Sequence, residues 1–454
     1  MLQGKTRTNL NVNLKVASFF VASLALTACG GGGGAGSSVA YQVGGTVSGL
    51  VSGTQVTLQN NSGDSLAITA NGAFNFATAE APGATYSVTV GTQPKGQTCA
   101  VTSGSGSVAN AGITSVSVAC TRIVYAYVPN GTDNNISQYS VGASGALSAL
   151  TTATVAAGQY PNAFVVTPSG KYAYVANYTA NNISQYTVGD DGSLTPIAPA
   201  TVSTGTAPAW IAIDPSGKYA YVANNSSNDI YQYTIGANGA LTAMSPASVA
   251  SSGSSPNVIA VEASGKYAYV VNNNSGNVSQ YTIGANGTLT AMSPATVSAG
   301  TNAIAIAIDP SGKYVYVANG GTSNSVSQYT IGSNGALTPM ATPTVGAGTQ
   351  PSFVTVDPSG KYVYVTNQGS NSVSQYIIGV GGALSAMSPA SVSAGTHPIN
   401  VATDPSGTHV YVVNQSNVSQ YTIGASGALT AMSPATVNTG AGPAQIAVTN
   451  AATQ

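Results

Sequence analysis

The sequence carries very little charge. Ten Lys and Arg and eleven Asp and Glu make up 5% of 454 residues, with a formal net charge of −1, whereas charged residues usually make up about 25% of a globular protein. A nucleic-acid partner is not expected, because no basic patch exists to neutralise phosphates. With two His and three Cys, the chain shows no cluster with metal-ligand spacing. We therefore expect neither a metal nor another cofactor.

Long hydrophobic runs are also missing. Beyond residue 28 no apolar run approaches the ~20 residues that a membrane-spanning helix needs. Disorder is equally disfavoured, because 43% of the residues are hydrophobic and 25 are Tyr, which offers ample surface to bury. Gly, Ser, Thr and Asn supply the polarity, a composition typical of strands and tight turns. We therefore expect an all-β protein.

Residues 1–28 have the features of an export signal. Basic residues in the first 15 positions precede a short apolar core, Val16 to Leu26, which is typical of a signal peptide. The sequence Leu26-Thr27-Ala28-Cys29 resembles the lipobox of bacterial lipoproteins. That resemblance implies cleavage before Cys29 and acylation of its thiol. An ordinary secretory signal followed by a chance cysteine is the alternative.

Residues 29–38 are predicted to form a flexible Gly/Ser-rich tether. In lipoproteins an Asp after the acylated Cys tends to mean retention in the inner membrane, so Gly30 points to the outer membrane. We thus expect a protein of the bacterial cell envelope, periplasmic or surface-exposed, whose membrane partner is reached through a lipid anchor at Cys29.

Residues 39–121 are expected to form a small β-sandwich. Six segments alternate apolar and polar residues between turn residues, which predicts strands: Gly45–Leu50, Gln55–Gln59, Leu66–Thr69, Ala73–Ala77, Tyr86–Val90 and Thr114–Ala119. The segments around Gly45-Thr46-Val47 and Asn71-Gly72-Ala73-Phe74 are similar to carboxypeptidase-regulatory-like and other prealbumin-like modules.

Two cysteines, Cys99 and Cys120, lie in this module. If Cys29 is acylated they form an even pair, and in an oxidising envelope compartment we expect them to form a disulfide. The loop that they enclose predicts a stabilisation of roughly 3 kcal/mol. A metal site is disfavoured because the module contains no His.

Residues 122–454 repeat a unit of 47 or 48 residues. The motif Tyr-x-Tyr-Val-x-Asn begins at Tyr125, Tyr172, Tyr219, Tyr267, Tyr314 and Tyr362, and His409 replaces the first Tyr in the seventh copy. Each unit contains four strand-like runs, joined by an Asp-Pro-Ser-Gly type I turn or its variants and by a Gly-containing hairpin. Seven such units predict a seven-bladed β-propeller.

The ends of the array predict how the ring closes. The N-terminal copy lacks the first strand of a blade, because Ile123–Val128 already corresponds to a second strand. At the C-terminal end, Ala444–Thr449 is a first strand with nothing after it. One blade is therefore expected to combine this strand with the three N-terminal ones, which leaves no open edge.

The repeat resembles the propeller-fold lactonase family and the surface-protein repeats named for Tyr-Val-Thr-Asn, present here as Tyr364-Val365-Thr366-Asn367. The family resemblance implies lactone hydrolysis in a pocket on one propeller face that contains Arg and His with an acidic partner. The chain has no Arg after Arg122. Neutral residues follow the Pro that opens each blade, as in Pro161-Asn162 and Pro256-Asn257, so the expected chemistry of the family is missing.

Few residues are left as candidates for a site. His397, next to Pro398, is a weak candidate for a catalytic base, and we predict Trp210, Asn225, Asn273 and His397 as ligand-binding residues of one propeller face. His409 is expected to be structural. The recurrent Tyr and Asn of the repeat are expected to serve packing and turns.

Three functions remain open from the sequence. The first is an envelope lipoprotein whose propeller is a non-catalytic binding or scaffolding module at the cell surface. The second is a lactonase-like hydrolase with divergent site chemistry, and this rests on resemblance alone. The third is binding of a carbohydrate or surface polymer, so a protein or a carbohydrate is the expected ligand.

Overall fold

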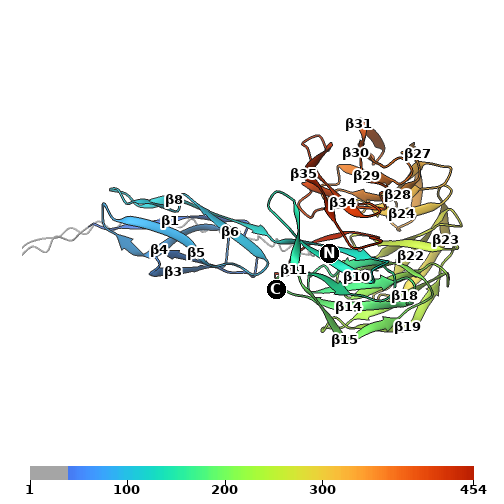
Figure 1. Cartoon of the computed structure of the whole chain (residues 1–454), viewed down its shortest axis with the longest axis horizontal. Coiled ribbons are helices and arrows are strands. Elements are labelled where there is room, and N and C mark those ends of the chain that lie inside the picture. The colour runs from blue at the N-terminus through green and yellow to red at the C-terminus, as the bar shows by residue number, and fades with distance from the viewer. Residues whose placement is uncertain (1–38, 454) are drawn as a thin grey trace, which may run out of the picture.

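The computed structural model describes residues 39–453, which form an elongated β-domain attached to a round β-domain (Figure 1). The described residues contain 36 strands and no helix, so none of them forms a helix that could cross a membrane. The predicted signal peptide, the tether and Cys29 lie outside the described residues. The all-β class is confirmed.

The elongated domain is a sandwich of two four-stranded sheets. One sheet has the order β4-β1-β8-β6 and the other β3-β2-β5-β7. The strands are β1 (Tyr41–Ser48), β2 (Val56–Asn60), β3 (Asp64–Ile68), β4 (Gly72–Glu80), β5 (Thr85–Thr92), β6 (Gln97–Thr102), β7 (Ser105–Ser107) and β8 (Ile113–Arg122). Alternate residues of these strands, including Val43, Leu58 and Phe76, form a separate core between the sheets. Strands β6 and β7 were not predicted, because one of the alternate residues that β6 buries is the polar Gln97 and β7 has only three exposed residues.

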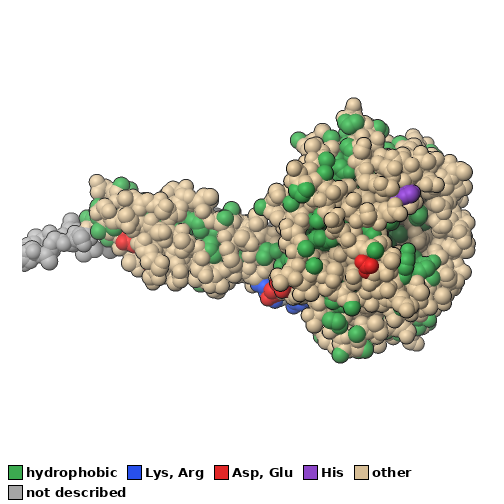
Figure 2. All heavy atoms as spheres, in the orientation of Figure 1, with side chains coloured by type: hydrophobic (Ala, Val, Ile, Leu, Met, Phe, Trp, Pro, Cys, Tyr) green, Lys and Arg blue, Asp and Glu red, His purple; other side chains and the backbone are tan. Residues whose placement is uncertain are grey.

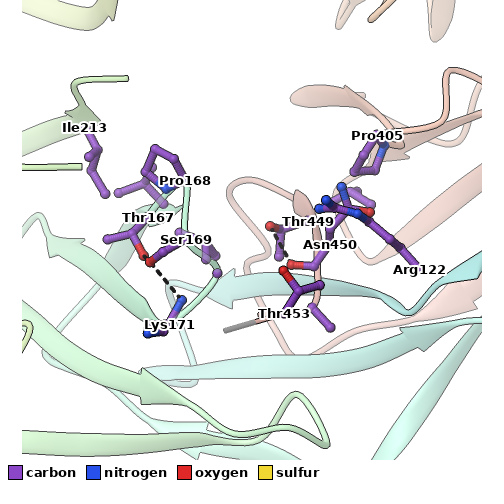
Figure 3. Close-up of a pocket in the computed structure, with 15 residues that line it drawn as sticks. Arg122, Thr167, Pro168, Ser169, Lys171, Ile213, Pro405, Thr449, Asn450 and Thr453 are labelled. Carbon is purple, nitrogen blue, oxygen red and sulfur yellow. Dashed lines mark hydrogen bonds between the residues drawn. The ribbon is translucent and has the colours of Figure 1, made fainter. Parts of the chain in front are cut away.

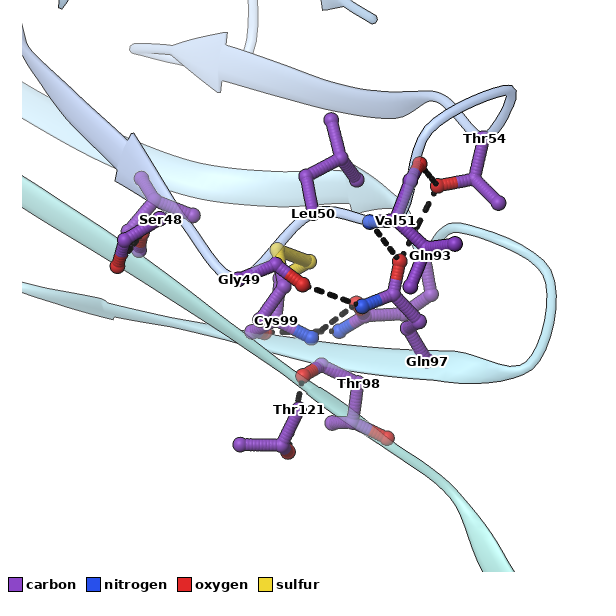
Figure 4. The surroundings of a disulfide bond; sticks show 12 residues. Ser48, Gly49, Leu50, Val51, Thr54, Gln93, Gln97, Thr98, Cys99 and Thr121 are labelled. Atoms are coloured by element: carbon purple, nitrogen blue, oxygen red, sulfur yellow. Dashed lines mark hydrogen bonds between the residues drawn. A yellow bond between two sulfur atoms is a disulfide. The ribbon is translucent and has the colours of Figure 1, made fainter. Parts of the chain in front are cut away.

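Cys99 of β6 and Cys120 of β8 form a disulfide within the sandwich, as predicted (Figure 4). The two residues are direct cross-strand partners with Cα atoms 3.9 Å apart. Beside them the buried Gln97 side chain donates to the carbonyl oxygen of Gly49 at 2.7 Å and accepts from the N–H of Val51 at 2.9 Å. The disulfide and this amide together fix the end of the sandwich that continues into the propeller.

The round domain is a propeller of seven four-stranded sheets, each antiparallel. Six blades each consist of four strands that are consecutive in the chain. The first three blades are β12 (Pro161–Val166), β13 (Tyr172–Asn177), β14 (Asn182–Val188), β15 (Leu194–Ser203); β16 (Pro208–Ile213), β17 (Tyr219–Asn224), β18 (Asp229–Ile235), β19 (Leu241–Ala250); and β20 (Pro256–Val261), β21 (Tyr267–Asn272), β22 (Asn277–Ile283), β23 (Leu289–Ser298). The next three are β24 (Ala303–Ile308), β25 (Tyr314–Asn319), β26 (Ser325–Ile331), β27 (Leu337–Gly346); β28 (Pro351–Val356), β29 (Tyr362–Asn367), β30 (Ser372–Ile378), β31 (Leu384–Ser393); and β32 (Asn400–Thr403), β33 (His409–Val413), β34 (Asn417–Ile423), β35 (Leu429–Asn438). The first strands of neighbouring blades contact one another and surround a central channel.

The seventh blade is built from both ends of the propeller. Its order is β11-β10-β9-β36, where β9 is Val124–Asn130, β10 is Asn135–Val141, β11 is Leu147–Ala156 and β36 is Ala447–Asn450. Ala447 of β36 pairs with Tyr127 of β9 in antiparallel register. The predicted closure is confirmed, and it satisfies the backbone edge that β9 would otherwise expose.

The second Tyr of each Tyr-x-Tyr motif joins neighbouring blades. Its buried hydroxyl donates to the carbonyl oxygen of the hairpin Gly of the next blade at 2.6–2.7 Å, from Tyr127 to Gly192 through to Tyr411 and Gly145. The repeat Gln makes a second bridge, since its side-chain oxygen accepts the N–H of a Leu in the following blade at 2.6–2.8 Å. These tyrosines therefore belong to the packing, as predicted.

The Asn that ends each second strand is 0–1% exposed. In the blade of β13, for example, the Asn177 amide donates to Asn182 Oδ1 and Ser184 Oγ, and its oxygen accepts the N–H of Gly158. These side chains fix the loops at one end of the strands. They do not line a face, so a ring of ligand-binding amides at these seven positions is excluded.

Candidate functional site

The end of the central channel opposite the sandwich forms the first candidate site. Two adjoining cavities of about 470 and 200 Å³ share Asn162, Ala209 and Asn257. We call this site the channel mouth and define it by Tyr160, Asn162, Tyr178, Trp210, Asn225, Asn257, Ser352, Phe353, Gln368 and Asn400. Most of these residues lie in or next to first strands, which converge on the channel, whereas Tyr178, Asn225 and Gln368 directly follow second strands. Amides and aromatic rings therefore dominate the lining.

Hydrogen bonds between blades orient the polar side chains of the mouth. Asn162 Nδ2 donates to the carbonyl oxygen of Ala209, and Asn257 Nδ2 donates to that of Ile304, both at 2.7 Å. The side-chain oxygens of these two asparagines accept no hydrogen bond from the described residues. An amide oxygen accepts two hydrogen bonds, so both are available to hydroxyl groups of a ligand.

Aromatic side chains complete the mouth. Trp210, the single Trp of the sequence, lies 5.2 Å from Phe353 between ring centroids. Tyr160 and Tyr178 are paired at 6.1 Å at the outer rim. Apolar ring faces next to amide groups are typical of sites for compounds with an apolar ring face and polar substituents.

The loop before each first strand has the same backbone but a different side chain in every blade. The residues adopt φ values between 50° and 68°: Tyr160, Ala207, Ser255, Asn302, Gln350, His397 and Gly442. A left-handed conformation costs a non-glycine residue roughly 1–2 kcal/mol, yet every blade keeps it. In five blades the N–H of this residue donates to an Asn side chain at 2.7–2.8 Å. The loops thus hold six different side chains and one glycine in the same backbone geometry, and Tyr160 is the one of these residues that lines the mouth.

The structure brings some of the predicted site residues together and leaves others apart. Trp210 and Asn225 line the mouth. Asn273 donates to the carbonyl oxygen of Ala303 at 3.3 Å but does not line the cavity. His397 is exposed and makes one hydrogen bond, from its backbone N–H to Asn371 Oδ1 at 2.8 Å. Within the described residues its imidazole has no partner.

The mouth contains no carboxylate, Lys, Arg or His. The two acids at this end of the described strands are held in loops: Asp229 accepts from Asn224 and Ser227, and Asp133 accepts the N–H of Ala441 at 2.7 Å. The visible face of the propeller accordingly shows very few charged side chains (Figure 2). Acid–base catalysis would need a positioned proton acceptor, and the mouth itself supplies none.

A second candidate site lies where the sandwich meets the propeller. We call it the junction cavity; its volume is about 840 Å³, and its lining includes Arg122, Asp404, Thr408 and His409. Asp404 Oδ1 accepts the backbone N–H groups of Thr408 and His409 at 2.8 Å. Thr408 Oγ1 lies 2.9 Å from His409 Nδ1 and 3.1 Å from Asp404 Oδ2. Asp404 Oδ2 itself lies 3.4 Å from Nδ1.

This arrangement fixes the imidazole ring of His409. Burial alone would raise the pKa of Asp404, but hydrogen bonds from Ser406, from backbone N–H groups and from His409 hold that pKa below its ordinary value. Asp404 is therefore an anion that favours a proton on Nδ1, which leaves Nε2 as the acceptor nitrogen. Nε2 has no partner among the described residues. The ring also packs on the hairpin of the next blade, since a Cβ atom at Gly145 would lie 2.1 Å from His409 Cδ2, which agrees with the structural role expected for His409.

Sequence reasoning missed most residues of both sites. Asp404 and His409 lie five residues apart in one turn, but Arg122 is far from both in the sequence, and only the folded chain brings it to their cavity. For the mouth a signal did exist: residues next to each opening Pro differ among seven otherwise similar copies, as in Asn162, Ala209 and Asn257. In residues 39–453 no cluster of His, Cys, Asp and Glu has the geometry of a metal site.

Comparison with known proteins shows which family the chain is related to. A family model described as lactonase, seven-bladed beta-propeller, matches residues 95–387, which is more than half of the sequence. A search of curated protein sequences found no match.

Solved structures show the same fold. A Bacteroides fragilis protein provisionally assigned as a 6-phosphogluconolactonase is 19% identical with a TM-score of 0.63, and the match covers 72% of this chain and 98% of that one. The periplasmic gluconolactonase of Pseudomonas aeruginosa is 19% identical with a TM-score of 0.60, over 72% and 99% of the two chains. The chain belongs to the lactonase family of seven-bladed β-propellers.

Proposed function

We propose that the protein binds an uncharged, polyhydroxylated cyclic ester, a sugar lactone, at the channel mouth. The observation that carries this proposal is the lining of the mouth, which combines amide groups and aromatic rings without an ionisable acid, base or cation. Membership of the lactonase family favours a lactone as the ligand over a purely scaffolding role of the propeller.

The chemistry of the mouth favours a neutral ligand over a phosphorylated one. A phosphate group is usually held by Arg, Lys or several backbone N–H groups, and no cation lines the mouth. Hydroxyl groups can instead donate to the open side-chain oxygens of Asn162 and Asn257, while a sugar ring packs on Trp210.

We also propose that the protein is attached to the outer membrane. Cleavage before Cys29 and acylation of its thiol would hold the protein at the outer membrane through the tether of residues 29–38. Labelling with a radioactive fatty acid tests this. Incorporation that Cys29→Ser abolishes is the expected result, and unchanged incorporation would contradict it.

Trp210 gives a direct assay of the mouth, because it is the single Trp of the chain. We expect glucono-δ-lactone to change the Trp fluorescence saturably, and Asn257→Ala to weaken binding by about tenfold, the effect of one lost hydrogen bond to a bound ligand. Asn273→Ala is the control, since Asn273 makes a similar backbone bond outside the cavity. Equal affinity of the two variants, or tighter binding of 6-phosphogluconolactone, would contradict the proposal.

Lactone hydrolysis at the junction cavity is the second candidate function. It is favoured because Arg122, His409 and Asp404 line one cavity, the combination that the family resemblance implies. His409 Nε2 would take a proton from water, and the resulting hydroxide would attack the ester carbonyl carbon. The carbonyl oxyanion would form beside Arg122, and the ring oxygen would leave with the proton from the imidazolium to give the hydroxy acid.

His409→Tyr is a sharp test of hydrolysis, because it restores the residue of the six other blades and should fold. We expect this substitution to reduce lactone turnover, followed by acid release, by at least about a hundredfold. His397→Ala is the parallel variant. Loss of turnover in His397→Ala with full turnover in His409→Tyr would assign catalysis to the mouth face instead.

A further inference from the structure

One cavity at the end of the channel that faces the sandwich is lined by two cations and no acid. A cavity of about 470 Å³ at this end is lined by Arg122, Lys171, Thr167, Ser169 and Asn450 (Figure 3). We call it the channel base. Arg122 leaves the sandwich on one side, and Lys171 lies in the turn between β12 and β13 on the other. No carboxylate lines this cavity.

The turn that carries Lys171 differs from the corresponding turns of the other blades. Elsewhere an acid begins the turn: Asp214, Glu262, Asp309, Asp357 or Asp404. Each of these is buried, and the chain places Thr167 at the same point of the turn beside the channel base. Lys171 is therefore the one repeat lysine whose own turn contains no carboxylate.

The hydrogen bonds of the turn show what the substitution removes. In the neighbouring blade, Asp214 accepts the N–H groups of Ser216 at 3.0 Å, Lys218 at 2.8 Å and Tyr219 at 2.7 Å. The turns at Asp309 and Asp357 repeat these distances.

The Thr167 side chain makes only some of the hydrogen bonds that the Asp side chain makes in the other turns. Its hydroxyl accepts the N–H of Tyr172 at 3.2 Å, while the N–H of Lys171 reaches only Ser169 Oγ, at 3.4 Å. The N–H of Ser169 has no partner among the described residues. The turn thus keeps the backbone of an anion-holding loop, with Gly170 at a φ of 73°, but lacks the anion.

Neighbouring acids form no ion pair with Arg122 or Lys171 among the described residues. Asp214 and Asp404 are the closest turn carboxylates along the ring, and their oxygens accept hydrogen bonds from their own turns. Asp190 is 3.1 Å from Lys95, with which it forms an ion pair. Arg122 and Lys171 make no ion pair within residues 39–453. Two cations and an unpaired N–H group around one cavity are the chemistry that recognises an oxyanion.

We propose that the channel base binds a small oxyanion, the carboxylate or phosphate group of a small molecule, between Arg122 and the turn of residues 167–171. The anion supplies the negative charge that an Asp side chain supplies in the other turns. This site lies at the opposite end of the channel from the mouth and shares Arg122 with the junction cavity. Binding of an oxyanion there goes beyond lactone binding at the mouth and does not depend on hydrolysis at His409.

Thr167→Asp tests the proposal because it restores the acid of the other blades. Titration calorimetry at low ionic strength, with inorganic phosphate and with gluconate as separate probes, is expected to show saturable binding of at least one of them. We expect Thr167→Asp and Lys171→Gln each to weaken that binding by at least about tenfold, since the first adds a negative charge that repels the anion and the second removes a positive charge that attracts it. Lys218→Gln is the matched control and should bind like the original protein.

Each outcome of this experiment is decisive. Binding of phosphate alone identifies a phosphate site, and binding of gluconate alone identifies a carboxylate site. Binding of neither probe, or binding that Lys218→Gln weakens as much as Lys171→Gln does, would overturn the proposal. Trp210 fluorescence with glucono-δ-lactone, measured on the same variants, keeps failure at this site separate from failure at the mouth.

Discussion

At the scale of single residues, hydroxyl groups of tyrosine connect blades that carry almost no charge. A hydrogen bond in a dry interface contributes a modest net free energy, but a buried carbonyl oxygen without its donor costs about 1–3 kcal/mol. Tyr411 closes the ring in this way, since its hydroxyl donates to the carbonyl oxygen of Gly145 at 2.6 Å. The same side chain is 0% exposed.

Tyr411→Phe should therefore lower the free energy of unfolding by about 1–3 kcal/mol. Tyr172→Phe is the control, because the Tyr172 hydroxyl bonds to Ala237 in an exposed position, and we expect a change below about 0.5 kcal/mol. Urea unfolding followed by circular dichroism measures both. Similar losses in the two variants would mean that the buried bond is not the cause.

At the scale of elements, the hairpin between the third and fourth strands depends on glycine for two separate reasons. Gly381 and Gly382 both have positive φ, 83° and 87°. A Cβ atom at Gly382 would lie 2.2 Å from Tyr314 Cδ1, whereas a Cβ atom at Gly381 would meet nothing within 4 Å. The first ring of each Tyr-x-Tyr motif thus packs flat on the hairpin of the next blade.

The adjacent glycines separate backbone strain from steric contact. Gly381→Ala should lower the free energy of unfolding by about 1 kcal/mol, because alanine is strained in the left-handed conformation. Gly382→Ala should lower the free energy of unfolding by roughly a further 1–3 kcal/mol, because the added methyl group would overpack the contact with Tyr314. Thermal unfolding of the two variants measures the difference, and equal losses would show that Tyr314 moves aside without cost.

Much of this element structure could be predicted from the sequence, because the period of 47 or 48 residues repeats the same strands and turns seven times. The closing strand followed from counting strands. Strands β6 and β7 could not be predicted, since β7 has only three residues, Ser105–Ser107, and is held by pairing with β5. The mouth was predicted in part, through Trp210 and Asn225. The junction cavity also depends on how the end of the sandwich at Arg122 sits against the propeller, and the repeat pattern carries no information about that contact.

At the scale of the whole molecule, the ring is closed by a short strand. Deleting residues 441–454 removes β36 and with it the buried side chains of Ile446, Ala451 and Ala452. We expect a loss of at least about 5 kcal/mol from lost burial and strand pairing, seen as a lower melting temperature. Removing residues 453–454 alone is the control. A synthetic peptide of residues 441–454 should restore the melting temperature, and no effect of the deletion would show that the ring is stable when open.

Buried tyrosines also determine how the whole molecule responds to alkali. Burial raises the pKa of Tyr186 and Tyr329 to about 12. A folded pKa above the unfolded value of 10 means that the unfolded chain loses its protons first, so the stability is fully present below pH 10 and falls as the pH rises toward 12. We expect cooperative unfolding in this range, with tyrosinate absorbance rising in the same transition. Ionisation of most tyrosines before unfolding would contradict this account.

Ring closure by β36 has a consequence for the order of synthesis. A ribosome completes the chain from its N-terminal end, so β9, β10 and β11 emerge long before the strand that completes their sheet. During that interval one backbone edge of β9 is unpaired, because Tyr127 has not yet formed its strand pairing with Ala447. The final blade therefore assembles last, and a nascent chain stalled before residue 447 cannot yet close its ring.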